Sequence, residues 1–441
     1  MSQLTVFRGA RGLGLLGLLV GLLVQPAAQA QTIADAVPAG RWTAAGPCVA
    51  RHALTPEAKR AAEALFGSTE AGEQQPAGQQ PACQQEGPQN PAADQPDGPE
   101  TAAQLQVEQR RRLSRSFAVP KQGRAFSLDT RYGRVQVNTW SKAEIKVEAE
   151  LVARAETDAG AKQVLEALGV QWLDYDARTG GVAVSTQFGP ALRGRAGGCR
   201  YQVNYTVWLP RTTALRIYDS FGDVTLNNDL RGNTELAVEY GTLRTARLEG
   251  PRNLIRIGNG DCRIAFAGRA SIDASYAQLR LDEGTTVDLR NNYSDVDIGT
   301  VQDLTVHSKY GDVALGSVRN LRGSSGYSRF TIDKLSEGLD MAVRYCPDFV
   351  VRDMGANFRQ INLDGGFSTI RLGFADAPAF RFDVSTEQGQ LLVDKNFVRV
   401  LSQENGPQTS DVLGVFGAVL PAQRAGNVNI KVRYGTVRFS K

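Results

Sequence analysis

Histidine is nearly absent from this sequence, which contains two histidines in 441 residues, His52 and His307. A zinc site needs several converging ligands, and a Ser-His-Asp triad would have to use one of these two histidines. No serine lies in a nucleophile elbow, and the Gly-Asn-Gly sequence at 258–260 opens no helix that would make it a phosphate-binding loop. The sequence therefore argues against zinc enzymes, serine hydrolases and nucleotide-binding proteins, and we expect no cofactor.

Long apolar runs are also missing, with one exception near the N-terminus. Residues 13–24 are apolar, Arg8 and Arg11 precede them, and the sequence Ala-Gln-Ala follows at 28–30. This arrangement is typical of a secretory signal peptide covering 1–30, and no other segment is long and apolar enough to cross a bilayer. We therefore expect a protein secreted to the periplasm or the cell surface, with no membrane span after signal cleavage.

A large excess of charge of either sign is lacking as well. Lysine and arginine number 50 against 46 aspartates and glutamates, and removal of the signal peptide with its two arginines lowers the net charge from +4 to +2. A nucleic-acid-binding protein concentrates basic residues on one face, so a pI near 8.8 does not by itself indicate such a partner. We expect no nucleic-acid binding.

Residues 31–115 form a predicted disordered linker. The tract 73–99 is rich in Gln, Pro, Gly and Ala, and it has almost no large apolar side chain to bury. One short helix is expected inside the linker, flanked by Cys48 and Cys83, which are two of five cysteines. In an oxidising compartment these two cysteines can form a disulfide, and the alternative is that they stay unpaired or pair between molecules.

A short motif recurs through the second half of the chain. An aromatic residue is followed by Gly or another small residue, then by a polar residue, then by alternating apolar residues, most clearly from Phe221, Tyr293 and Tyr310. The corresponding positions are residues 221, 240, 259, 276, 293, 310, 327 and 345. The step is 17 to 19 residues, and a near-constant step of this length is typical of one coil of a β-solenoid.

Apolar residues hold fixed places in each copy of the motif. They lie six and four positions before the aromatic residue and three and five after it, as Leu304, Val306, Val313 and Leu315 do around Tyr310. Alternation with period two predicts strands, and its change of parity predicts a bend, which we expect the Gly or Ser after the aromatic residue to supply. The predicted fold is all-β: a β-solenoid or β-helix with coils of 17 to 19 residues.

Caps are expected at both ends, because the end of a solenoid exposes unpaired strand edges. The predicted boundaries are an N-terminal β-rich cap at 116–212, the solenoid repeats at 213–373 and C-terminal cap strands at 374–441. One short helix is expected in the N-terminal cap, from an N-cap at Thr157 to Leu168.

Two aspartates, Asp295 and Asp312, lie two positions after the aromatic residue in neighbouring copies of the motif. Stacked carboxylates can hold Ca²⁺, which takes six to eight oxygen ligands. Asp at a strand corner is also ordinary turn chemistry, and this interpretation is favoured. We expect no metal site, and these two residues are the candidates for one.

Three arginines, Arg244, Arg263 and Arg280, lie four positions after the motif's first residue in three successive copies. They are expected to stack on an outward sheet face about 4.8 Å apart, where like charges repel one another. Either nearby acids such as Asp282 and Asp297 or an anionic partner must relieve this repulsion. Because arginine suits bidentate contacts, we name this arginine row as a candidate site for acidic glycan or lipid phosphate; a solvated charged surface is the alternative.

The chain resembles the putative-adhesin family of secreted bacterial proteins, a domain of unknown function. The resemblance rests on the Tyr-Gly strand followed by Trp at 132–142, on the segment 201–210 that ends in Val-Trp-Leu-Pro, and on the repeated aromatic-Gly-Asp-Val sequence. It covers about 117–441 and implies an exported β-solenoid. It brings no catalytic residues, and the family's name suggests adhesion.

Tight coils between 219 and 345 favour a uniform surface over a catalytic cleft framed by loops. We therefore expect no enzyme. The leading interpretation is a secreted β-solenoid that presents a rigid polar face for adhesion or for binding an envelope or surface polymer, glycan or protein. The alternatives are a structural or regulatory scaffold of the envelope and a glycan-active β-helix lyase or hydrolase.

Overall fold

The computed structural model describes residues 107–119, 124–177, 180–192, 200–374, 379–417 and 426–441. These residues form 26 β-strands in a single sheet, one α-helix and one 3-10 helix. The prediction of an almost entirely β chain is therefore confirmed. The predicted signal peptide, the linker up to residue 106, Cys48 and Cys83 lie outside the described residues.

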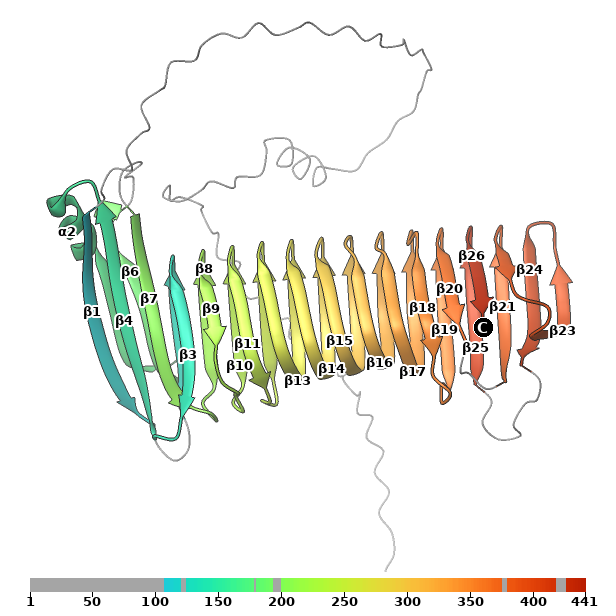
Figure 1. The fold of residues 1–441 in the computed structure, drawn as a ribbon, viewed down its shortest axis with the longest axis horizontal. Coiled ribbons are helices and arrows are strands. Elements are labelled where there is room, and N and C mark those ends of the chain that lie inside the picture. Colours follow the sequence, from blue (N-terminus) through green and yellow to red (C-terminus); the bar gives the residue numbers. More distant parts are fainter. Residues whose placement is uncertain (1–106, 120–123, 178–179, 193–199, 375–378, 418–425) are drawn as a thin grey trace, which may run out of the picture. The chain divides into compact units, whose positions relative to one another are not determined.

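The central strands, β8 to β20, follow one another in sequence order (Figure 1). Their bounds are β8 (Leu215–Ser220), β9 (Asp223–Leu226), β10 (Thr234–Glu239), β11 (Thr242–Leu248), β12 (Asn253–Gly258), β13 (Asp261–Ser275), β14 (Gln278–Asn292), β15 (Asp295–Lys309), β16 (Val313–Gly326), β17 (Phe330–Arg344), β18 (Phe349–Met354), β19 (Gln360–Gly366) and β20 (Thr369–Gly373). All their pairings are parallel: Ile217 lies opposite Leu236, and Leu289 lies opposite Val306. Equivalent positions of the motif are thus brought side by side.

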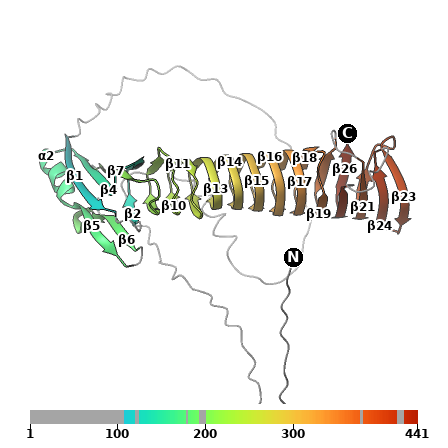
Figure 2. The same ribbon diagram turned by 90° about the horizontal axis from the view of Figure 1, so that it is seen from below.

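Each copy of the motif contributes one layer with a thin apolar interior. Strands before the aromatic corner, such as β10, and strands after it, such as β11, lie on opposite sides of the layer (Figure 2). The apolar positions Val287, Leu289, Val296 and Ile298 are at most 3% exposed, and one hydrophobic cluster runs from layer to layer. Cys262 belongs to that cluster as a buried free thiol.

The residue that makes the bend is the first residue of the motif, not the glycine after it. A left-handed φ between 51° and 63° is shared by Tyr132, Phe221, Tyr240, Asn259, Tyr276, Tyr293, Tyr310, Tyr327, Tyr345, Phe367 and Tyr434. Among the described glycines that follow them, only Gly311 has a positive φ. The expectation that Gly or Ser supplies the bend was therefore wrong. It followed from the general rule that aromatic residues rarely adopt a left-handed conformation, which costs about 1–2 kcal/mol per residue.

The glycine after the corner permits close contact between layers instead. A Cβ added to Gly241 would lie 1.8 Å from the carbonyl oxygen of Gly222, and one added to Gly260 would lie 1.9 Å from that of Gly241. Where serine takes this place, its hydroxyl forms a bond between layers: the Ala277 N–H donates to Ser294 Oγ over 3.0 Å. Small residues are therefore required here by the spacing of the layers.

At the N-terminal end, spatial order departs from sequence order. The strands are β1 (Val107–Ala118), β2 (Ala125–Arg131), β3 (Arg134–Trp140), β4 (Glu144–Ala155), β5 (Leu168–Asp176), β6 (Gly181–Phe188) and β7 (Arg200–Pro210). β2 and β3 pair in parallel with β8 and β9, and β6 and β7 pair in parallel with the far sides of β2 and β3. β4 and then β1 continue antiparallel beyond β7, and β5 does so beyond β6.

The first strand begins earlier than predicted. β1 starts at Val107, inside the segment assigned to the linker, so the boundary at 116 is corrected. Its sequence is rich in arginine and shows no apolar alternation, and its pairing depends instead on charge: Arg112 lies opposite Glu150 and forms an ion pair of 3.0 Å with it. A pattern search for apolar residues cannot detect such a strand.

The predicted helix is present as α2 (Asp158–Glu166), and a 3-10 turn, η1 (Pro190–Leu192), follows later. The Thr157 hydroxyl oxygen accepts a hydrogen bond from the Gly160 N–H, which confirms its prediction as the N-cap. Across the part of the chain that is described, no helix combines the length and the apolar character that a bilayer crossing requires.

At the C-terminal end the last two strands of the sequence are inserted into the stack. The strands are β21 (Phe380–Glu387), β22 (Gln390–Leu392), β23 (Val398–Asn405), β24 (Thr409–Phe416), β25 (Asn427–Arg433) and β26 (Thr436–Ser440). β25 and β26 pair with β19 and β20 on one side and with β21 and β22 on the other. β24 and then β23 add antiparallel beyond β21, within the segment predicted to form C-terminal cap strands, and β23 is exposed on both faces.

Candidate binding surface

The arginine row consists of Arg244, Arg263 and Arg280, which lie directly opposite one another on β11, β13 and β14. Two of the three are neutralised: Arg263 pairs with Asp282 at 3.4 Å, and Arg280 pairs with Asp282 at 3.1 Å and with Asp297 at 3.5 Å. The hydrogen bond from Arg280 lowers the pKa of Asp282 below its usual value. Among the described residues Arg244 has no ion-pair partner, so one guanidinium group of the row remains available to an anion.

The candidate metal-binding aspartates make turn contacts. Asp295 accepts a hydrogen bond from the Asp312 N–H over 3.0 Å, and Asp312 in turn pairs with Arg329 at 3.0 Å. No group of three or more His, Cys, Asp or Glu that could hold a metal ion occurs within the described residues. Both contacts are of the kind that polar residues make at strand corners.

A row of stacked rings lines the corner. This aromatic row consists of Tyr132, Phe221, Tyr240, Tyr276, Tyr293, Tyr310, Tyr327, Tyr345, Phe367 and Tyr434. Ring centroids of stacked neighbours lie 4.5 to 5.2 Å apart with interplanar angles of 3° to 17°. Because each ring face covers the next, the row presents ring edges and hydroxyl groups to solvent, and the stacking offsets the left-handed backbone.

A pocket of about 420 Å³, here called the N-terminal pocket, lies where the aromatic row meets β4 and β7. Its rings are Tyr132, Tyr201, Phe221 and Tyr240. Tyr132 is stacked on Phe221 at 5.2 Å, and Tyr201 meets Tyr132 edge-on at 5.5 Å and 88°. The edge-on ring ends the stacking and leaves a hollow beside it that is walled by aromatic surface.

Three arginines also line the N-terminal pocket. Arg134 and Asp223 approach to 3.9 Å, and Arg154 pairs with Glu108 at 2.5 Å. The hydrogen bond from Arg154 is the largest cause of a lowered pKa at Glu108. Arg200 has no ion-pair partner among the described residues, so the site holds more positive than negative charge and suits an anionic ligand that also offers a flat face.

A buried carboxyl group lies behind the rim of the same pocket. Asp219 is 3% exposed and faces inward between Thr130 and Val238 of the adjoining strands. A Cβ added to Gly222, which lines the pocket, would lie 2.3 Å from Asp219 Oδ2. Burial, and then the charge of Asp223, raise the pKa of Asp219 to about 7.

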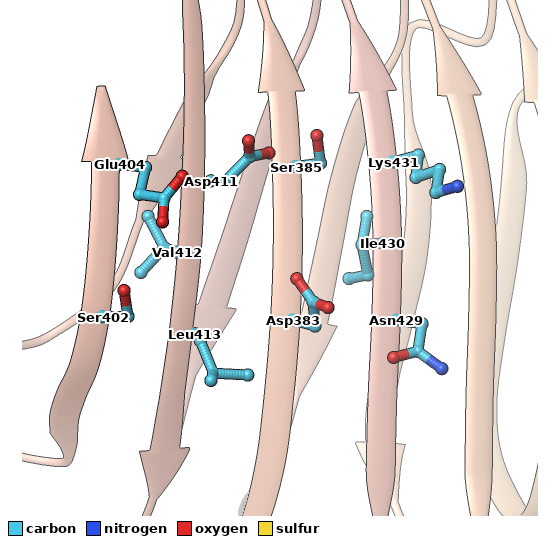
Figure 3. Close-up of a pocket in the computed structure, with 10 residues that line it drawn as sticks. All are labelled: Asp383, Ser385, Ser402, Glu404, Asp411, Val412, Leu413, Asn429, Ile430 and Lys431. Carbon is cyan, nitrogen blue, oxygen red and sulfur yellow. The ribbon is translucent and has the colours of Figure 1, made fainter. Parts of the chain in front are cut away.

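A second hollow, of about 650 Å³, lies over the outer face of β21, β23, β24 and β25 (Figure 3). Asp383, Glu404 and Asp411 line it together with Lys431, so carboxylates outnumber ammonium groups. Surface of this sign repels an acidic polymer. These two hollows therefore differ in charge, and of the two the N-terminal pocket fits the predicted class of ligand.

Sequence reasoning identified the arginine row but missed Arg134, Arg154 and Arg200. These residues come from three distant strands, β3, β4 and β7, and only the antiparallel arrangement of β4 on β7 brings them together. One signal was present: Arg134 follows Tyr132 at the motif position that Asp223 holds in the next layer. The remaining two arginines have no pattern that would have marked them.

Comparisons with known proteins give weak similarity. A putative cell adhesion protein from Clostridium sporogenes is 10% identical with a TM-score of 0.16, over 76% of this chain and 98% of that chain. A putative adhesin from Bacteroides fragilis is 9% identical with a TM-score of 0.29, over 75% of this chain and 97% of that chain. No known protein family and no curated protein matches the sequence. Similarity at this level carries no argument, and the resemblance to the putative-adhesin family stays a prediction.

Proposed function

We propose that this protein is a secreted, non-enzymatic β-solenoid that binds an acidic polymer of the cell envelope or of a surface to which it adheres. Parallel pairing of strands 17 to 19 residues apart supports the solenoid. The predicted signal peptide at 1–30 supports export, and the Pro- and Gln-rich linker supports a role as a tether.

The N-terminal pocket is the observation that carries the proposal. It combines the rings of Tyr132 and Tyr201, which meet edge-on, with the guanidinium group of Arg200, which has no ion-pair partner within the described residues. A sugar ring packs its apolar face on an aromatic side chain, and a carboxylate or sulfate group on that sugar accepts hydrogen bonds from arginine. An acidic glycan satisfies both requirements at once, whereas a neutral glycan would leave the arginines unused.

The proposal contains no catalytic step. The aromatic corners are short, as between β8 and β9, and do not project the long loops that frame most catalytic clefts. An arginine beside the rings of the pocket that has no ion-pair partner within the described residues favours a ligand-binding role over a scaffold without a ligand. Binding of a surface polymer therefore agrees better with the pocket than either alternative.

The test is retention of the purified full chain on immobilised polygalacturonate, measured as the salt concentration needed for elution. Arg134→Ser combined with Arg200→Ser is expected to weaken binding about tenfold, which corresponds to the loss of about one charge-assisted hydrogen bond. Arg290→Ser is the control, because it removes one exposed positive charge far from the pocket in sequence and on another strand, β14.

The control is expected to elute close to the wild type. Equal retention of the wild type and the pocket double variant would overturn the proposed site. Absence of retention of the wild type on polygalacturonate, heparin and anionic vesicles alike would overturn binding of an acidic polymer altogether.

A further inference from the structure

The aromatic row has one gap, at Asn259. Asn259 has the same left-handed φ, 52°, as its aromatic equivalents. Its layer is in register, because the Asn259 N–H donates to the Ser275 carbonyl over 3.0 Å and the Tyr240 N–H donates to the Gly258 carbonyl over 2.9 Å. Only the ring is missing, so the interruption is a change of side chain within an unchanged backbone.

The gap leaves two ring faces without a stacking partner. Tyr240 is stacked on Phe221 at 4.9 Å and Tyr276 is stacked on Tyr293 at 5.1 Å, each on one side only. Tyr276 is 57% exposed, the largest value among the exposed rings of the row. The side chain of Asn259 is short, half-buried and ends in an amide, so it offers no ring to either tyrosine.

The gap has the height of a single flat ring. Tyr240 and Tyr276 are two layers apart, which corresponds to about 9.6 Å at the spacing of paired strands. Stacked neighbours elsewhere in the row are 4.5 to 5.2 Å apart, so a six-membered ring placed midway has a normal stacking distance to both. A ligand that supplies one ring therefore completes the row.

Polar groups around the gap favour a sugar over an aromatic side chain. Exposed carboxylates of Glu239 and Asp261 lie next to the corner and accept hydrogen bonds from hydroxyl groups. The arginine row lies on the same three layers, and its Arg244 has no ion-pair partner among the described residues. An aromatic side chain would leave the arginines unused, whereas a sugar with both hydroxyl and carboxylate groups uses both sets of groups.

We infer that the gap at Asn259, bounded by the faces of Tyr240 and Tyr276, is a binding slot for one uronic-acid ring of an acidic polysaccharide. The ring lies between the two tyrosines, its hydroxyl groups face Glu239 and Asp261, and its carboxylate faces the arginine row. The inference rests on the proposed function and adds a second contact to it, because Tyr240 also lines the N-terminal pocket.

The test uses the full chain and a short oligomer of galacturonic acid, with affinity measured by calorimetry. Asn259→Tyr supplies the missing ring from the protein itself. We expect it to raise the melting temperature, since tyrosine adopts this backbone conformation in the other layers, and to weaken oligomer binding at least tenfold. Asn259→Gly is the matched control: it keeps the slot open, tolerates positive φ and is expected to bind within twofold of the wild type.

Unchanged oligomer binding by Asn259→Tyr, with a raised melting temperature, would overturn the slot. If that variant binds normally while the Arg134→Ser and Arg200→Ser double variant is weakened, the slot fails and the proposed function stands. If the wild type binds no acidic oligomer, both fail. If Asn259→Tyr loses binding to tyrosinamide but keeps binding to the oligomer, the gap accepts an aromatic side chain and not a sugar ring. That result would overturn the inferred ligand class.

Discussion

From β8 to β18, each strand pairs with the strand one repeat further along the sequence, whereas at both ends chain order and spatial order diverge. β6 and β7 lie outside β2 and β3 at the N-terminal end, and β25 and β26 lie inside β21 and β22 at the C-terminal end. Antiparallel strands follow beyond them, β4 and β1 at one end and β24 and β23 at the other.

The difference shows what a repeated motif can specify. Inner apolar residues and a left-handed corner make each layer complementary to the next, but these features do not limit the number of layers. Termination depends on residues that break the motif, such as the arginines of the outermost strand β1, which blunt an edge that would otherwise pair with another chain. If this comparison is right, the same substitution should change the free energy of unfolding by different amounts at the centre and at the ends.

The largest expected effect is the loss of apolar volume at the centre. Leu289 is fully buried and Leu401, on β23, is 53% exposed. Leu289→Ala should lower the free energy of unfolding by about 2–5 kcal/mol and Leu401→Ala by less than about 0.5 kcal/mol. Urea denaturation followed by circular dichroism measures both. Similar values for the two would contradict the distinction between centre and end.

The next effect concerns the junction between the end and the centre, where Asp219 is buried with its pKa raised to about 7. At this one group the unfolded chain binds fewer protons than the folded chain between about pH 4 and pH 7, so the contribution of Asp219 to stability is greatest below pH 4, falls through this range and is constant above it. Asp219→Asn should remove most of that fall and raise the free energy of unfolding at pH 8 by about 2–3 kcal/mol.

The measurement is a series of urea denaturation curves from pH 4 to pH 8 for the wild type and the variant. Asp129→Asn provides a comparison, since Asp129 lies on the adjoining strand β2 but is exposed. Parallel pH profiles for wild type and Asp219→Asn would show that this carboxyl group does not titrate near pH 7.

A smaller effect is expected from the aromatic row. Tyr310 is stacked on Tyr293 at 4.5 Å and on Tyr327 at 5.1 Å, whereas Tyr276 is stacked on Tyr293 alone because of the gap. Tyr310→Ala should cost about 1–2 kcal/mol of stability and Tyr276→Ala about half of that, since each stacked pair contributes about 0.5–1.5 kcal/mol. Thermal unfolding measures the ratio, and equal losses would mean that stacking does not hold the corner.

The smallest effect is expected from the charged edge at the N-terminal end. Glu150→Gln removes the partner of Arg112, and the loss should be below about 1 kcal/mol because the arginine is largely exposed. Added salt should abolish the difference from the wild type, since exposed ion pairs are screened. A loss of stability that persists in 1 M salt would indicate that the Glu150 side chain stabilises the fold by packing and not by its charge.

The aromatic motif predicted the stacking of layers but not the conformation of its own first residue. The same spacing led to Phe221, Tyr293 and Tyr310, and it placed the arginine row on adjacent strands. It does not extend to β23, which is exposed on both faces. The N-terminal pocket was not predicted either, because its arginines lie on strands that are not related to one another by the repeated motif.

The sequence by itself determined the β character of the chain, the helix that starts after Thr157 and the pairing of successive copies of the motif from β8 to β18, because these depend on local alternation, on one capping residue and on a nearly constant step. Only the tertiary structure decided which strands close the ends, where Arg200 meets Tyr132, and that the place of Asn259 is a gap between two rings. These features arise where residues distant in sequence come together, and the free energy of such contacts is not encoded in any single segment.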